Sequence, residues 1–325
     1  MQRLFCATLA LCAAVPGQSP FASRVVSFDD MGQAGGGVFA PSNTLGAPDG
    51  TVHSLGIGGN VVLGFDVVIA DGPGADLIVS ENPFVSTSNP ALTFAEMLFV
   101  EVSSDGTSFA RIPNRYDGPA VSPGPFAFVN AGAYEGMAGA GATNPSAVDL
   151  RDVVEAGGDA IDLADLAGHP LVTSGVVDLA AITQVRLVDV RDGVDQDSRG
   201  VTIYDPGSGS ADIDGVTVVH DAASAVAPGP IVDVTIPADG AFELSFDDPD
   251  GWRDLDPASL QVALYGTPVG LVALLPLMNI SRFDATGFTL KLRGVLPAGF
   301  LLRVSASAKD LSGHRSGDVR SRPTP

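Results

Sequence analysis

The sequence predicts an all-β protein with many loops, and three observations support this fold class. The acidic residues divide into 32 Asp and 6 Glu, and Asp favours turns and caps where Glu favours helices. The 39 Gly and 24 Pro suit many tight connections between strands. Short segments rich in β-branched and aromatic residues recur between these turn residues, whereas helical periodicity is weak. A chain of 325 residues has enough material for two domains.

Most of the predicted strands lie in the first two thirds of the chain, and residues 20–221 are expected to form the first domain. They are predicted at residues 24–28, 61–65, 77–79, 97–102, 109–112, 126–129, 185–190 and 216–219. Residues 100–112 predict two strands joined by a turn at Asp105-Gly106, which is the strongest hairpin signal in the chain. Weak helical patterns occur at residues 147–155 and 163–166.

A stretch rich in Pro, Ala and Gly at residues 222–230 predicts a linker to a second domain. Short strands are predicted beyond it at residues 231–236, 242–246, 260–265, 288–292 and 301–306. Their spacing is typical of a sandwich, and it predicts that residues 231–325 form a smaller immunoglobulin-like β-sandwich without a disulfide. Trp252, the only tryptophan, follows a turn and is expected to cap this small core.

The charge of the chain restricts its partners. A net charge of −21 excludes a general affinity for nucleic acid or for anionic membrane surfaces, because both would be repelled. A hydrophobic content of 45% excludes a disordered acidic tail. Residues 20–227 hold 27 acids and 7 bases, whereas residues 228–325 hold 11 acids and 9 bases. The acidity therefore belongs to the first domain.

The N-terminus predicts export. Residues 1–19 read as a signal peptide, with Arg3 before an apolar stretch that is too short to span a bilayer. Cys6 and Cys12 both lie within it, so the mature chain would hold no disulfide, and its stability must come from the core or from bound ions. The other apolar run, residues 269–278, contains a proline and is expected to be a core strand or loop, with no membrane span.

Several segments, taken in order, resemble a widespread group of secreted bacterial cell-surface proteins. They are residues 47–50, 54–66, 71–84, 157–166, 203–206 and 211–216, together with the Val-x-Val-Ser-x-Asp-Gly pattern at residues 100–106. That pattern also occurs in the discoidin-like, galactose-binding-like jelly rolls. The resemblance implies a jelly-roll β-sandwich, a secreted or bacterial cell-surface location, and a binding role. The C-terminal membrane or sorting segment usual in this group is not visible, which leaves attachment to the cell open.

An acidic segment of the first domain is the sharpest candidate site. Calcium takes six to eight oxygen ligands, and closely spaced Asp residues in a loop that contains Gly supply them. The candidate ligands are Asp189, Asp192, Asp195, Asp197, Asp212 and Asp214, with Gly200 and Asp205 between them. The spacing is not that of an EF-hand, because the closing Glu is missing. A solvated acidic turn without an ion is the alternative, and the sequence leaves both open.

Glu81 is the other candidate ligand, because it directly follows a predicted buried strand and Glu is scarce in this chain. Strand ends converge at one rim of a sandwich, so Glu81, Asp49 and Asp214 can meet there although they are distant in the sequence. Asp49 and Asp71 each precede a glycine and are better explained as turn formers. A buried carboxylate needs a partner, and the first domain holds few bases, so a structural calcium ion is the expected partner of Glu81.

Catalytic patterns are weak. The four histidines stand in no recognisable motif, and no Gly-x-Ser-x-Gly elbow is present. We therefore expect a secreted, non-catalytic binding module, stabilised by calcium, that recognises a carbohydrate or another cell-surface component, with the second domain as a spacer or partner surface. One alternative is a structural envelope or matrix protein without a small ligand. The other is a secreted hydrolase that uses carboxylates such as Glu81 with a loop Asp.

Overall fold

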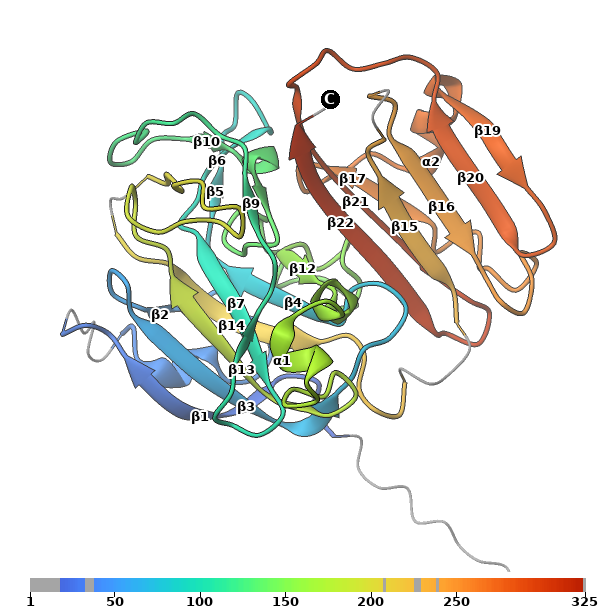
Figure 1. Ribbon diagram of the computed structural model, residues 1–325. Helices are drawn as coiled ribbons and strands as arrows, with labels where there is room; N and C mark the ends of the chain where they lie inside the picture. The colour runs from blue at the N-terminus through green and yellow to red at the C-terminus, as the bar shows by residue number, and fades with distance from the viewer. Residues whose placement is uncertain (1–17, 33–37, 207–208, 225–228, 238–239, 324–325) are drawn as a thin grey trace, which may run out of the picture.

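Two β-sandwiches lie side by side in the computed structural model of this protein (Figure 1). The structure describes residues 18–32, 38–206, 209–224, 229–237 and 240–323. The predicted all-β fold class is confirmed. Residues 1–17 of the predicted signal peptide and residues 225–228 of the predicted linker lie outside the described residues. None of the described helices is long and apolar enough to cross a membrane.

The first sandwich consists of two antiparallel sheets, ordered β1-β3-β13-β7-β8 and β12-β4-β14-β2. The strands of the larger sheet are β1 (Ala22–Asp29), β3 (Asn60–Ile69), β13 (Ile182–Asp189), β7 (Leu98–Ser103) and β8 (Ala110–Arg111). The strands of the smaller sheet are β12 (Asp159–Ile161), β4 (Leu77–Glu81), β14 (Asp212–Val218) and β2 (His53–Ser54). The predicted hairpin around Asp105 is present as β7 and β8, with Val102 opposite Ala110.

The strand pairing of the first sandwich is that of a jelly roll. When the edge strand β1 is set aside, the eight remaining strands pair first with last, second with seventh, third with sixth, and fourth with fifth. These pairs are β2 with β14, β3 with β13, β4 with β12, and β7 with β8. One long hairpin rolled into two sheets gives this pairing, so the predicted jelly-roll sandwich is confirmed.

Short elements fill the connections of the first sandwich. A small sheet contains β5 (Phe84–Val85), β6 (Leu92–Phe94) and β10 (Val129–Asn130), and β9 (Arg115–Tyr116) pairs with β11 (Tyr134–Glu135). The short helices are η1 (Pro41–Thr44), η2 (Ala131–Ala133), η3 (Leu163–Leu166) and α1 (Pro170–Thr173). The weak helical pattern at 163–166 thus becomes a 3-10 helix, whereas residues 147–155 form turns and residues 126–128 form no strand.

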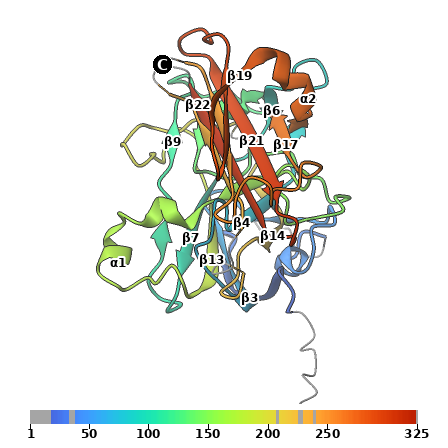
Figure 2. The same ribbon diagram turned by 90° about the vertical axis from the view of Figure 1, so that its right-hand side faces the viewer.

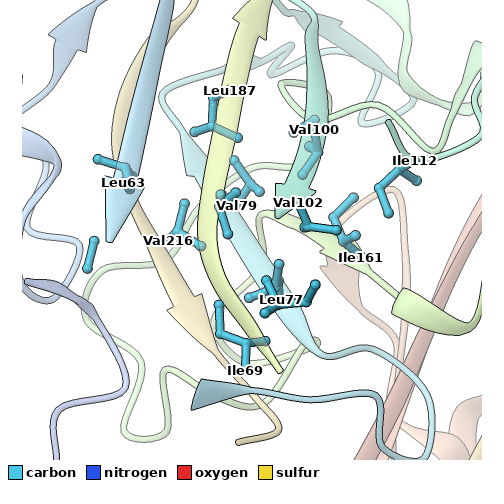
Figure 3. Close-up of a cluster of buried hydrophobic side chains, with 14 of the residues drawn as sticks. Leu63, Ile69, Leu77, Val79, Val100, Val102, Ile112, Ile161, Leu187 and Val216 are labelled. Carbon is cyan, nitrogen blue, oxygen red and sulfur yellow. The ribbon is translucent and has the colours of Figure 1, made fainter. Parts of the chain in front are cut away.

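Alternating apolar side chains from the two sheets form the core of the first sandwich. In Figure 3, Leu63, Val100 and Leu187 of the larger sheet meet Val79 and Val216 of the smaller one. Each of these five side chains is fully buried. Burial of so many methyl groups is the main stabilising term of such a domain.

Strand β4 is buried on both faces. Leu77 and Val79 point into the core of the first sandwich, whereas Ile78 joins a separate cluster with Val153 and with Ala263 of the second domain. A strand that is covered on both sides needs no polar face, which explains why residues 77–79 form an unbroken apolar run.

The second sandwich has the strand arrangement of an immunoglobulin-like domain. Its sheets are ordered β15-β16-β20-β19 and β18-β17-β21-β22. Without the short β18, the seven strands in chain order fall into sheets 1-2-5-4 and 3-6-7, as in immunoglobulin constant-type domains. The strands are β15 (Ile231–Thr235), β16 (Glu243–Asp247), β17 (Gln261–Leu264), β18 (Thr267–Pro268), β19 (Met278–Phe283), β20 (Gly287–Leu292), β21 (Leu301–Lys309) and β22 (Arg315–Pro323). The run at 269–278 is not a strand but holds two short helices, α2 (Leu271–Leu274) and η4 (Leu275–Leu277).

The hairpin of β21 and β22 packs against the first domain (Figure 2). Arg303 and Asp159 form a buried ion pair across this interface, with 2.7 Å between Nη2 and Oδ1. Ala75 N–H donates to the carbonyl of Gly317 at 2.8 Å, and the hydroxyl of Ser307 donates to Asp152 at 2.8 Å. The second domain is therefore held against the first by buried polar contacts.

Candidate metal centre

Five carboxylates gather where strands of both sheets end in the first sandwich. They are Glu81, Glu96, Asp189, Asp205 and Asp212, named here the acidic cluster. Strand β4 ends at Glu81 opposite the start of β14, and β13 ends at Asp189 opposite the start of β7. The antiparallel pairing within each sheet therefore brings strand ends and strand starts to the same rim.

Residues 209–212, which lead into β14, contact three carboxylates of this cluster. Asp189 accepts hydrogen bonds from the N–H groups of Gly58 at 2.8 Å and Ala211 at 2.9 Å. Glu81 Oε1 accepts from the N–H of Asp212 at 3.1 Å. A Cβ added to Gly209 would lie 2.7 Å from Glu96 Oε1, so this backbone passes directly against that carboxylate. The contacts fix the side chains in place.

Glu81 holds the unsatisfied atom of the cluster. Its side chain is 3% exposed, and Oε2 is buried without a hydrogen-bond partner. A buried carboxylate oxygen without a donor is costly when it is ionised. A proton or a cation at this oxygen would remove the cost.

Burial, and then the negative charges of neighbouring carboxylates, disfavour ionisation of the acidic cluster. Burial, and then the negative charges of Asp212, Asp189 and Asp205, raise the pKa of Glu96 to about 8. Burial raises the pKa of Asp189 to about 7, although the N–H groups of Gly58 and Ala211 act in the opposite direction. Burial also raises the pKa of Glu81 well above its usual value. These shifts favour a bound proton or a positive ion at Glu81, Glu96 and Asp189 at neutral pH.

The donor set suits calcium, because it consists of carboxylate oxygens on backbone that also offers carbonyl groups. Within the described ranges, two other trios of acids bring one oxygen each within 4.8 Å of one another, and the acidic cluster is not one of them. An ion at the cluster would therefore contact at most two of its carboxylates in this geometry. Carbonyl groups and water would complete its coordination.

Four of the predicted calcium ligands are engaged in other ways. Asp195 pairs with Arg191 at 2.6 Å, and Asp197 pairs with Arg199 at 2.8 Å and accepts from three N–H groups. Asp192 accepts from the hydroxyl of Ser122.

Asp214 accepts from the N–H groups of Asp49 and Gly50, at 3.0 Å each. The meeting of Glu81, Asp49 and Asp214 that the sequence allows is thus only partly observed, because Asp214 stays with the turn at Asp49. Asp192, Asp195, Asp197 and Asp214 are held by hydrogen bonds and ion pairs. Two of them adjoin the acidic cluster, because Asp192 accepts from the N–H of Asp205 at 3.2 Å and the charge of Asp195 raises the pKa of Asp189. The structure gives each of these four carboxylates a protein partner, and their role as calcium ligands stays a prediction.

Glu96 is the member of the cluster that the sequence analysis missed. It stands two residues before the buried strand β7, just as Glu81 ends the buried strand β4. The scarcity of Glu in this chain, applied to Glu96 as it was to Glu81, would have indicated it.

A second group of acids surrounds Asp76. The side chain of Asp76 accepts from the N–H groups of Gly72 and Leu163 at 2.8 Å and contacts His220 Nδ1 at 3.1 Å. Burial raises the pKa of Asp76 to about 6 and that of the neighbouring Asp162 to about 8. Because both oxygens of Asp76 have partners, this group is best explained as a structural connection between the loop before β4, η3 and the end of β14.

A row of phenylalanines lies beside the acidic cluster in the sequence and in the fold. Phe84 opens β5 three residues after Glu81, and Phe94 ends β6 two residues before Glu96. The ring centroids of Phe84 and Phe94 are 6.3 Å apart, and Phe126 stacks on Phe94 at the same distance. Phe84 is 59% exposed and Phe126 is 75% exposed. These three residues, named here the aromatic row, form an apolar surface that the sequence analysis did not predict.

The fold and the site together define a two-domain β-sandwich protein with a buried acidic cluster beside an exposed aromatic surface. No protein-family model matches the chain, and no curated protein matches it in sequence. Its function therefore has to be argued from the geometry of this site.

Proposed function

We propose that this chain is a secreted, non-catalytic binding module that recognises a carbohydrate of the cell surface. The observation that supports this most directly is the aromatic row next to the acidic cluster. A contiguous exposed apolar patch rimmed by polar residues is a feature of ligand-binding surfaces. The rings of Phe84 and Phe126 offer flat apolar faces on which the C–H faces of a sugar ring can stack.

Calcium is proposed as the stabilising ion of the acidic cluster. The orphaned Glu81 Oε2 and the mutual repulsion of the carboxylates both favour a bound cation. Outside the cell, calcium is the hard cation that carboxylate and carbonyl oxygens select. A bound ion would also order the backbone that leads from Glu81 into β5, and hence the position of Phe84.

A glycan array with calcium present tests the proposal. We expect binding that is lost in Phe84→Ala and Phe126→Ala while the melting temperature stays within about 2 °C of that of the unchanged protein, because both side chains are largely exposed. Phe28→Ala is the matched control, since Phe28 is also about half exposed but lies on β1. A blank array, or equal binding by all three variants, would refute the proposal and favour a structural protein without a small ligand.

A carboxylate-dependent hydrolase is the second candidate, and one observation favours it. A Glu96 whose pKa is raised to about 8 is protonated at neutral pH, as a general acid must be. If the array identifies a glycan, its breakdown should be measured with the unchanged protein and with Glu96→Gln. Hydrolysis that disappears in the variant would replace the binding proposal with the enzymatic one.

A further inference from the structure

The loop that joins β16 to β17 in the second domain brings three carboxylates together. Asp248, Asp250 and Asp254 each place one oxygen atom within 4.8 Å of the others. They lie within seven residues of one another and flank Gly251, which has a φ of 110°. The sequence analysis explained this stretch only as a turn that carries Trp252.

Asp248 provides the observation that goes beyond a cluster of acids. Its side chain is buried, with only 1% of the residue exposed. One oxygen, Oδ1, accepts from the N–H of Asp250 at 2.8 Å, whereas Oδ2 is buried and has no hydrogen-bond partner. Asp248 thus carries a buried oxygen without a donor, directly beside two other carboxylates.

Two basic residues in or beside this loop, Arg253 and His314, face other partners. The guanidinium group of Arg253 lies over the ring of Trp252, 5.4 Å from its centroid. His314 Nδ1 lies 2.6 Å from Asp310 Oδ2, so this imidazole faces Asp310. Neither residue compensates the buried oxygen of Asp248.

Backbone hydrogen bonds hold the loop in its conformation. Gly251 N–H donates to the carbonyl of Asp248 at 2.9 Å, and Asp254 N–H donates to the carbonyl of Gly251 at 2.8 Å. The N–H of Leu311 donates to the carbonyl of Asp254 at 2.8 Å, which connects the loop to the turn between β21 and β22. The three carboxylates are therefore held close together before any ligand arrives, which lowers the cost of binding.

We propose that Asp248, Asp250 and Asp254 bind a calcium ion at this end of the second sandwich. Three carboxylates without His or Cys are a hard donor set, which fits calcium and not zinc. Asp250 is exposed, so water can complete the coordination to six or more oxygens. With three carboxylates, the expected dissociation constant lies at about 10⁻⁴ to 10⁻³ M, as in extracellular modules. This site is independent of the acidic cluster and of the proposed function.

Trp252 allows this one site to be observed in the full chain. It is the only tryptophan, and it lies in the loop between Asp250 and Asp254. Terbium replaces calcium at oxygen sites and emits when an adjacent excited indole transfers energy to it. Excitation at wavelengths that tryptophan absorbs and tyrosine does not will therefore report terbium in this loop, whatever happens at the acidic cluster.

We expect terbium emission that is sensitised by Trp252, saturates, and is displaced by calcium. Asp250→Asn should weaken terbium binding by about tenfold or more without affecting the fold, because Asp250 is exposed. Asp248→Asn should abolish the emission, and near-unchanged circular dichroism would show that the variant folds. Asp256→Asn is the matched control, since this residue lies in the same loop and accepts from the N–H of Ala258, as an Asn can.

Two results would overturn the proposal. One is the absence of sensitised emission from the folded protein at millimolar terbium. The other is emission of equal strength in the unchanged protein and in Asp250→Asn. Glu96→Gln should leave the emission unchanged, because Glu96 lies in the first domain. A failure of the calcium proposal for the acidic cluster therefore leaves the result of this test unaffected.

Discussion

Replacing Glu96 with Gln should make the metal-free protein more stable at alkaline pH. In the folded protein the pKa of Glu96 is raised to about 8, from an ordinary value of 4.5. A carboxyl group whose pKa is higher in the folded state contributes stability that is fully present below its unfolded pKa and is lost as the pH rises through its folded pKa. For Glu96 the loss falls between about pH 4.5 and pH 8. Gln remains neutral and avoids this loss.

The size of the effect follows from the two pKa values. At about 1.4 kcal/mol for each pKa step, a rise from 4.5 to about 8 corresponds to about 5 kcal/mol. Part of the rise in the pKa of Glu96 comes from Asp212, Asp189 and Asp205, which can take up protons themselves. We therefore take about 3 kcal/mol as the lower bound of the stability that the folded protein loses at Glu96. We expect Glu96→Gln to melt about 6–15 °C higher than the unchanged protein at pH 8.5, and within about 2 °C of it at pH 4.5.

The assay is thermal unfolding of the full chain in chelator, followed by circular dichroism from pH 4.5 to pH 8.5. Asp66→Asn is the control, because Asp66 is exposed on β3 and its contact with the hydroxyl of Ser23 survives the change. The control should follow the pH profile of the unchanged protein. Calcium at pH 8.5 should raise the melting temperature of the unchanged protein more than that of Glu96→Gln. A profile without a decline towards pH 8.5, or the same decline in Glu96→Gln, would refute the reasoning.

Three further predictions test other parts of the structure. Glu81→Gln should weaken calcium binding to the first domain by about tenfold in calorimetry, and an unchanged affinity would remove Glu81 from the site. Arg303→Met should lower the free energy of unfolding in urea by about 3–5 kcal/mol, because Asp159 then stays buried without its cationic partner. A loss below about 1 kcal/mol would show that this pair contributes little to the interface. Gly59→Ala should cost about 3 kcal/mol or more, because its Cβ would lie 1.9 Å from a backbone carbonyl oxygen. Gly168→Ala, with open space around it, should unfold like the unchanged protein in calorimetry.

Local patterns in the sequence predict the long strands well. Apolar residues in alternation or in unbroken runs place β3, β7, β13 and β21 close to where they lie, because burial of one or both faces leaves a direct mark on the sequence. The short strands β5 and β6 were not predicted, and the predicted strand at 126–129 overlaps β10 at a single residue. These three strands contain two or three residues each, and long-range pairing, not local propensity, makes them strands. Residues 271–277 of the apolar run at 269–278 form two short helices, because an apolar pattern of this length does not distinguish a strand from a short helix.

The candidate site was predictable only where strand ends determine it. Glu81, Asp189 and Asp212 sit at strand ends, and the convergence of those ends at one rim follows from a sandwich fold. The sequence does not reveal whether an Asp in a loop faces an ion or a backbone N–H. Asp195 and Asp197 illustrate this, because arginines two or four residues away and nearby N–H groups occupy their oxygens.

The jelly-roll pairing also determines when this domain can form during synthesis. The first strand of the jelly roll after the edge strand β1 is β2, and it pairs with the last strand, β14. Strand β14 lies between β2 and β4 within the smaller sheet. A nascent chain that ends before residue 212 lacks this central strand, so its smaller sheet cannot assemble. Contacts between residues this far apart in the sequence also form slowly. The chain therefore stays without its first core until more than two thirds of it has been made, and chaperones can act on it throughout that interval.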